Sequence, residues 1–126
     1  MTMIWKLLAA GTAVLAATAA QAHPKLLKSM PAAGASIAAP KVIVLVFSEK
    51  VVPNFTGVEL TMTAMPGTQN HPALKLDGLR TRFAPGGKTL IVTPGNRLAP
   101  GGYRIDWHAV AGDTHRITGK FSFTVR

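Results

Sequence analysis

Short runs of β-forming residues, separated by turns rich in proline and glycine, are the feature that most constrains the fold of this chain. Proline and glycine favour turns and interrupt helices and strand ladders. After residue 22, no segment keeps the apolar period of a helix for three turns. The runs with buried or alternating strand patterns cover residues 41–47, 57–63, 89–93, 103–108 and 119–126. Strands at this spacing predict an all-β fold, an antiparallel Greek-key sandwich or barrel.

The alternating runs also predict which side chains face the core, because neighbouring residues of a strand point to opposite faces. The predicted inward sets are Val58, Leu60 and Met62; Tyr103, Ile105 and Trp107; and Phe121, Phe123 and Val125. An additional early strand at the sheet edge is expected within residues 26–37.

The first 22 residues have the pattern of a secretory signal peptide. A short start with Lys6 is followed by an alanine-rich apolar stretch from Leu7 to Ala20, and then by Ala20-Gln21-Ala22. This order of a basic start, an apolar middle and small residues predicts cleavage after Ala22. An uncleaved membrane anchor is the alternative, although the stretch is shorter than the ~20 residues of a spanning helix. We therefore expect a signal peptide at 1–22 and one domain at 23–126.

Composition excludes several classes of site and partner. The chain has no cysteine, so disulfides, iron–sulfur clusters and thiolate zinc sites are excluded. It carries 14 Lys and Arg against five acids, a net charge of +9. Such a charge suits acidic partners, but the basic residues are scattered and lack the interleaved aromatics of a single-strand binder. We expect no nucleic-acid partner and interpret the charge as a solvated basic surface.

His23 is the first candidate metal ligand, because cleavage after Ala22 makes it the N-terminal residue. Its α-amine and imidazole then close a chelate ring on one metal ion, and nitrogen donors in a tetragonal arrangement suit Cu(II). Pro24 has no backbone N–H, so the metal cannot recruit a deprotonated amide there. The alternative is that a histidine follows the cleavage point by coincidence.

Three further residues are candidates beside His23. In an extended segment Asp113 and His115 lie two residues apart, so their side chains face the same side. The simpler interpretation of that spacing is that Asp113 caps a turn and that His115 is a surface residue. Glu49 ends the most apolar run and is suited to an axial ligand or to orienting an imidazole. Its alternative is an ion pair with Lys50 or an arginine. For His108, beside Trp107 on a strand, we expect a structural hydrogen bond.

A second, softer group consists of Met62, Met65 and His71. Thioethers prefer Cu(I), but Met62 lies on the same predicted face as Val58 and Leu60 and is expected in the core. At most, the group predicts a weak Cu(I) site. There is no Ser/His/Asp set in a nucleophile context and no obvious acid–base pair of carboxylates.

The chain resembles the CopC family of periplasmic copper resistance proteins, and the resemblance extends over all of residues 23–126. The matching motifs are His23-Pro24-Lys25-Leu26, Ser29-Met30-Pro31-Ala32-Ala33-Gly34, Phe47-Ser48-Glu49, Met62-Thr63-Ala64-Met65-Pro66-Gly67, Tyr103-Arg104-Ile105-Asp106-Trp107-His108-Ala109-Val110 and Asp113-Thr114-His115-Arg116-Ile117-Thr118-Gly119. The resemblance implies an immunoglobulin-like Greek-key fold and one Cu(II) ion bound by His23, Asp113 and His115, with Glu49 near the site. Some relatives also bind Cu(I) in a methionine-rich loop. Here only Met62 and Met65 match that loop, and the later methionines are absent.

These observations predict a periplasmic, monomeric protein that sequesters or carries Cu(II) for copper homeostasis or resistance, without catalysis. An inner-membrane copper transporter is the expected recipient. The main alternative is a copper-dependent oxidative enzyme, because polysaccharide monooxygenases also use an N-terminal histidine brace. A flat aromatic binding face and an open coordination position would be needed for that activity. A metal-free interaction domain is the third possibility.

Overall fold

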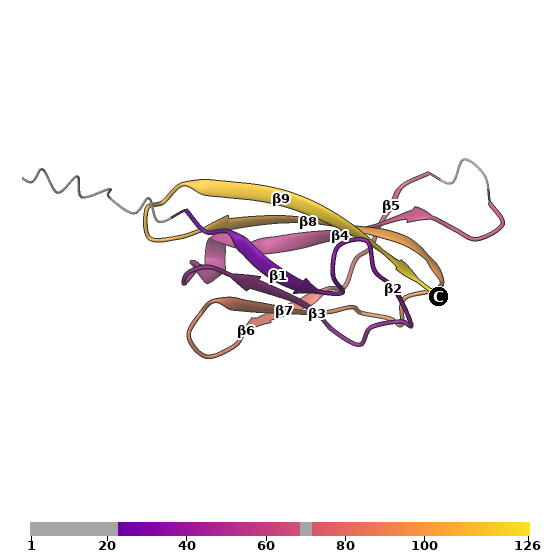
Figure 1. Ribbon diagram of the computed structural model, residues 1–126, viewed down its shortest axis with the longest axis horizontal. Helices are drawn as coiled ribbons and strands as arrows, with labels where there is room; N and C mark the ends of the chain where they lie inside the picture. Colours follow the sequence, from indigo (N-terminus) through magenta and orange to yellow (C-terminus); the bar gives the residue numbers. More distant parts are fainter. Residues whose placement is uncertain (1–22, 69–71) are drawn as a thin grey trace, which may run out of the picture.

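The chain folds as two β-sheets packed face to face. The computed structural model describes residues 23–68 and 72–126, and Figure 1 shows the two layers. The strands are β1 (Leu26–Met30), β2 (Ser36–Ile37), β3 (Ile43–Phe47), β4 (Gly57–Ala64), β5 (Leu74–Lys75), β6 (Arg80–Phe83), β7 (Thr89–Thr93), β8 (Gly101–Val110) and β9 (Arg116–Val125). A single turn of 3-10 helix, η1 (Pro53–Phe55), precedes β4. In the described part of the chain no helix is long and apolar enough to cross a bilayer.

The strand order places several pairs of sequence neighbours in different layers. One sheet has the order β1-β3-β7-β6, and the other has the order β2-β9-β8-β4-β5. The chain therefore crosses between the sheets repeatedly, and the long hairpin of β8 and β9 forms the middle of the second sheet. The predicted all-β sandwich is confirmed, and every predicted run contains a strand.

The early segment differs from the prediction of one edge strand across residues 26–37. It forms two strands that belong to different sheets: β1 pairs with β3, and β2 pairs with β9. A buried Pro31 and a turn with Gly34 at φ 77° separate them. The pairing of β2 with β9 is parallel, so the sandwich is not wholly antiparallel. Proline cannot donate to a ladder, which explains why the strand stops there and the chain changes layer.

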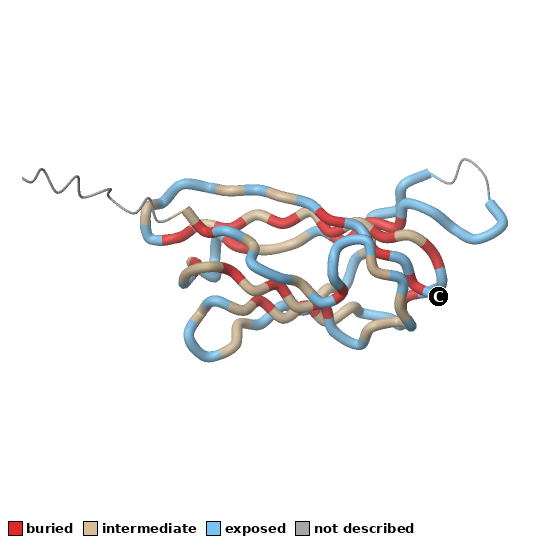
Figure 2. The backbone as a smooth tube through the Cα atoms, viewed as in Figure 1, coloured by how far each residue is buried: buried red, intermediate tan, exposed pale blue. Residues whose placement is uncertain are grey.

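The core lies between the sheets and consists of the predicted inward faces. Figure 2 shows buried residues along both layers, with exposed residues in the turns and on the outward faces of strands such as β9. Ile105, Leu60 and Leu90 are fully buried, and Tyr103 is 1% exposed. The ring of Trp107 meets Phe47 edge to face, with centroids 5.4 Å apart. Burial of each large apolar side chain contributes about 1.5–3 kcal/mol, so packing supports this cysteine-free fold.

One end of the sandwich gathers segments that are far apart in the sequence. The start of β1, the end of β3 and the turn between β8 and β9 all lie there (Figure 1). The helical turn η1 reaches the same end, because Val52 donates its N–H to the carbonyl of Val110 at 2.7 Å. The candidate Cu(II) ligands predicted from the sequence, His23, Glu49, Asp113 and His115, are on or next to these segments.

Candidate metal centre

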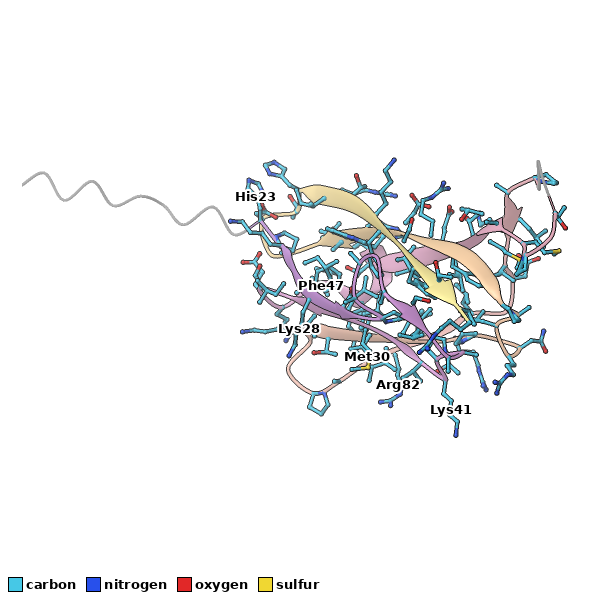
Figure 3. The ribbon with its side chains drawn as sticks, turned by 45° about the vertical axis from the view of Figure 1, so that its right-hand side comes forward. His23, Lys28, Met30, Lys41, Phe47 and Arg82 are labelled. Atoms are coloured by element: carbon cyan, nitrogen blue, oxygen red, sulfur yellow. The ribbon has the colours of Figure 1, made fainter. Side chains whose placement is uncertain are left out.

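His23, Asp113 and His115 form a three-residue cluster at this end of the sandwich. His23 lies three residues before the start of β1, whereas Asp113 and His115 lie in the turn between β8 and β9. One ligand atom from each residue can be chosen so that all three lie within 4.8 Å of one another. Figure 3 shows His23 at the end of the molecule, beside that turn. The fold thus brings together residues that are about 90 positions apart in the sequence.

The carboxylate of Asp113 lies between the two imidazoles. Its Oδ2 atom is 2.9 Å from Nδ1 of His23 and 3.6 Å from Nδ1 of His115. The two rings are stacked, with centroids 5.5 Å apart and planes inclined by 21°. Two nitrogens and one oxygen therefore face a common space.

The contact between His23 and Asp113 is close, yet it does not have the direction of a hydrogen bond. Nδ1 of His23 and Oδ2 of Asp113 are both inaccessible to solvent, and neither has a hydrogen-bond partner among the described residues. Buried polar atoms are almost always partnered, because an unmade hydrogen bond costs about 1–3 kcal/mol. A positive ion bound by both atoms would satisfy them together. The donor set thus fits a metal.

The turn that carries Asp113 is different from the extended segment assumed from the sequence. Oδ1 of Asp113 accepts the N–H of His115 at 3.1 Å, and the N–H of Thr114 reaches the carbonyl of Ala111 at 3.0 Å. Thr114 has φ 65°, a left-handed conformation that costs a non-glycine residue about 1–2 kcal/mol. Asp113 thus caps the turn with one oxygen, as the simpler interpretation proposed. Its other oxygen faces the two histidines.

The segment after His23 is fixed to the end of β3. Pro24 is fully buried. Lys25 donates its N–H to Oγ of Ser48 at 2.9 Å, and Ser48 donates its own N–H to the carbonyl of Lys25 at 2.8 Å. These contacts hold the backbone beside His23 in place. Sequence reasoning did not identify Ser48 as a functional residue, and its only signal was its position between Phe47 and Glu49.

Glu49 lies beside the cluster but is not one of its three members. Its Oε1 atom is buried and has no hydrogen-bond partner in the described part of the chain. The residue borders a shallow hollow shared with Val52, Pro53 and Gly112. Gly112 directly precedes Asp113, so Glu49 is adjacent to the turn that carries Asp113.

The other candidate residues are not brought to this cluster. His108 lies outside it, on the outward face of β8, next to Gly57. Partial burial and the charge of Arg116 lower the pKa of His108, and Glu59 partly opposes this shift. Met62 is 4% exposed and belongs to the core, whereas Met65 is 40% exposed in a turn. His71 lies outside the described residues.

The buried nitrogen of His23 is Nδ1, and this indicates how His23 can bind a metal. Nδ1 is the imidazole nitrogen closest to the backbone, and it is the atom of His23 that faces Asp113. It can close a compact chelate ring with the backbone nitrogen of its own residue once that nitrogen is an amine. Imidazole and amine nitrogens with a carboxylate oxygen suit Cu(II) among divalent first-row ions.

Comparison with known proteins gives three kinds of match. The family model described as CopC domain matches residues 26–126. Copper resistance protein C from Pseudomonas syringae pv. tomato is 46% identical over 122 residues, 95% of this chain and 92% of that protein. Copper resistance protein C from Escherichia coli is 41% identical over 122 residues, 95% of this chain and 94% of that protein.

A solved structure agrees with this similarity at the level of the fold. The crystal structure of PcoC, described as a methionine-rich copper resistance protein from Escherichia coli, superimposes with a TM-score of 0.76 at 40% identity. The match covers 83% of this chain and 100% of that chain. In contrast to a methionine-rich protein, residues 23–126 contain only Met30, Met62 and Met65.

Proposed function

The chain belongs to the CopC family, and from this membership we propose that it binds Cu(II) and sequesters or carries the ion in copper homeostasis or resistance. Relatives that match nearly the whole chain are named copper resistance proteins. The proposal treats copper as cargo, bound and released without chemical turnover.

The proposed ligands of a single Cu(II) ion are the α-amine and Nδ1 of His23, Oδ2 of Asp113 and the imidazole of His115. The observation that carries this assignment is the pair of buried atoms, Nδ1 of His23 and Oδ2 of Asp113, that face each other without a hydrogen bond. The amine exists only after cleavage at Ala22, which the signal-peptide pattern predicts. Pro24 lacks an N–H, so coordination by the backbone stops at the amine.

Glu49 is proposed to act beside these ligands. Its buried Oε1 atom has no hydrogen-bond partner among the residues that the structure describes, and a carboxylate near a bound imidazole or amine can orient the ligand or approach the metal axially. Because Glu49 is outside the three-residue cluster, its contribution to affinity is expected to be smaller than that of Asp113.

The exposure of His115 supports a role in carrying the ion. Its side chain is 67% exposed, whereas that of Asp113 is 19% exposed. An acceptor can therefore replace His115 first, while the buried ligands still hold the ion. We propose that the protein acts as a monomer in the periplasm after export, and that an inner-membrane copper transporter is the recipient.

The burial of Tyr103 and Trp107 favours a carrier over the oxidative enzyme considered from the sequence, and the exposed Phe55 is a single ring that does not make a flat face by itself. Tyr103 is 1% exposed and Trp107 is 8% exposed, so neither provides a flat binding face for a polymer. The carboxylate of Asp113 also occupies a ligand position that oxygen would need. The copper-loaded protein is expected to show no turnover with oxygen or peroxide.

A strong Cu(I) site is not proposed. Of the two methionines that match the start of the methionine-rich loop, Met62 is packed in the core and only Met65 is exposed. A single buried thioether supplies one soft ligand, which is too few for a strong Cu(I) site. We expect Cu(I) affinity to be weak and insensitive to Met62.

A Cu(II) titration of the exported protein, cleaved before His23, tests this function. The titration is monitored by electron paramagnetic resonance and by competition with a chelator, for the wild type, His115→Ala and His108→Ala. One ion per chain is expected, with lower affinity and one fewer nitrogen ligand in His115→Ala. The matched histidine control, His108→Ala, is expected to behave as the wild type. Equal binding by all three proteins would overturn the assignment.

A further inference from the structure

The outward face of the four-stranded sheet carries basic residues and no acidic ones. Cross-strand partners share a face, so the pairing of Arg82 with Ile91 and of Arg80 with Thr93 places both arginines outward on β6. The pairing of Lys28 with Val46 places Lys28 on the same side. With Lys41 before β3, these four cations are here called the basic face. All four are exposed.

Figure 3 shows the arrangement of three of these residues. Lys28, Lys41 and Arg82 lie along one side of the molecule, away from β8 and β9. None of the four basic residues forms an ion pair with any residue that the structure describes. Strands β1, β3, β6 and β7 contain no aspartate or glutamate.

The other sheet has a different charge pattern. There Glu59 pairs with Lys75 at 2.9 Å and Asp106 pairs with Arg104 at 2.8 Å. Its outward face therefore has local charge compensation. That face also carries Arg116 and Lys120, which have no ion pair among the described residues. The two sheets differ because Glu59 and Asp106 offset part of the positive charge there, whereas the strands of the basic face contain no acid.

An apolar strip lies between the cations. Met30 pairs with Val44, and Val44 pairs with Ile91, so the three residues cross the sheet on its outward side. Met30 is 65% exposed, and Val42 beside this strip is 37% exposed. Lys28 and Lys41 each border a shallow hollow at the edge of the face, whereas Val44, Arg80, Arg82 and Ile91 border neither hollow. The face therefore has an apolar strip at its centre and a basic rim.

We propose that the basic face binds the surface of a bilayer that contains anionic phospholipid. Lys and Arg side chains reach the phosphate layer, and each contributes roughly fivefold to binding near an anionic membrane. The apolar strip meets the boundary between the headgroups and acyl chains. A protein partner is less favoured because binding hot spots lie in pockets that enclose anchor residues near the centre of an interface, and the two hollows beside Lys28 and Lys41 do not include the apolar strip.

Membrane binding in this orientation leaves the metal centre free. His23 lies at the end of the sandwich, beside the turn between β8 and β9 and off the basic face (Figure 3). The protein would then exchange copper while moving in two dimensions along the bilayer. The inference does not depend on the ligand assignment, because none of the proposed ligands belongs to the basic face.

Vesicle flotation with the mature chain tests the proposal. Vesicles of phosphatidylcholine alone are compared with vesicles that also contain phosphatidylglycerol, at low and high salt. We expect binding only to the anionic vesicles and loss of binding at high salt, since surface charges are screened. Binding to neither vesicle, or equal binding to both, would overturn the proposal, even if an acidic protein were found to bind this face.

Two charge-reversed variants of equal net charge separate the basic face from the overall charge. Arg80→Glu/Arg82→Glu is expected to lower binding by about 30-fold or more. The control Lys75→Glu/Lys120→Glu makes the same change on the other sheet and is expected to retain most of the binding. Equal loss in the two variants would contradict the proposal. Thermal melting and Cu(II) titration check that each variant is folded.

Discussion

Nδ1 of His23 lies 2.9 Å from Oδ2 of Asp113, and both atoms are buried without a hydrogen-bond partner in residues 23–68 and 72–126. The two residues are far apart in the sequence. The turn between β8 and β9 is capped by the other oxygen of Asp113, Oδ1, which accepts the N–H of His115. The carboxylate therefore has separate structural and ligand atoms. This separation allows the ligand function to be changed without breaking the turn.

Asp113→Asn is the substitution that uses this separation. The amide oxygen still accepts the N–H of His115, but the anionic ligand is removed. We expect Cu(II) affinity to fall by ~100-fold or more, about 2.7 kcal/mol, with the apo protein within about 0.5 kcal/mol of the wild type in unfolding. Chelator competition and urea denaturation measure the two effects. Unchanged affinity would exclude Asp113 as a ligand.

Ser48→Ala tests whether the backbone after His23 is held in place for metal binding. It removes the acceptor of the Lys25 N–H, and a lost hydrogen bond of this kind costs about 1 kcal/mol. Cu(II) affinity is expected to fall about fivefold, with an unchanged electron paramagnetic resonance spectrum, because no ligand is lost.

Ser29→Ala is the matched control for Ser48. The hydroxyl of Ser29 bonds to the carbonyl of Pro31 at 2.8 Å, within the same strand region but outside the cluster. Its Cu(II) affinity is expected to equal that of the wild type. If both serine variants lowered the affinity equally, general destabilisation would explain the effect of Ser48→Ala.

Gly119→Ala tests the packing of β9 against Trp107. A Cβ at position 119 would overlap the indole ring, whereas one at Gly112 meets no atom within 4 Å. We expect Gly119→Ala to lower the free energy of unfolding by about 1–3 kcal/mol, which exceeds the ~0.4–1 kcal/mol gained from reduced chain entropy. Thermal melting should show a lower Tm for Gly119→Ala and a Tm no lower than that of the wild type for Gly112→Ala. A wild-type Tm for both would show that Trp107 repacks freely.

The lowered pKa of His108 predicts that stability depends on pH. Because partial burial lowers this pKa in the folded protein, the unfolded chain takes up the proton more readily as the pH falls through its ordinary value of about 6.5. The contribution is therefore present above that pH and is lost below it. Urea denaturation near pH ~7.5 and pH ~5 should show a smaller loss of stability for His108→Gln than for the wild type. Identical losses would rule out this contribution.

The strands and the core were predictable from the sequence because they depend on local periodicity. The alternation of Tyr103, Ile105 and Trp107 with polar residues is sufficient to predict which side of β8 faces the core, and all three are buried. The division of residues 26–37 between two sheets was not predictable, since strand pairing is a long-range property. Short strands such as β2 contain too few residues to show a pattern.

The candidate ligands were proposed from the chemistry of residue types, but their arrangement was not accessible to that reasoning. The left-handed Thr114 places Asp113 and His115 together in a turn, where an extended segment had been assumed. The role of Ser48 depends on the position of Lys25 across the sheet, for which the sequence has no local signal. Glu49 was proposed from its place at the end of an apolar run, and its role as a ligand or orienting group stays a prediction.

The central claim is that the N-terminal amine of His23 binds Cu(II) together with Nδ1, and blocking that amine tests it most directly. Chelator competition compares the chain that begins at His23 with the same chain extended by one alanine before it. The extension keeps every side chain but converts the amine into an amide. We expect the extended chain to bind at least ~100-fold more weakly and to lose one nitrogen ligand from its resonance spectrum. Equal affinity and an unchanged spectrum would show that the amine is not a ligand.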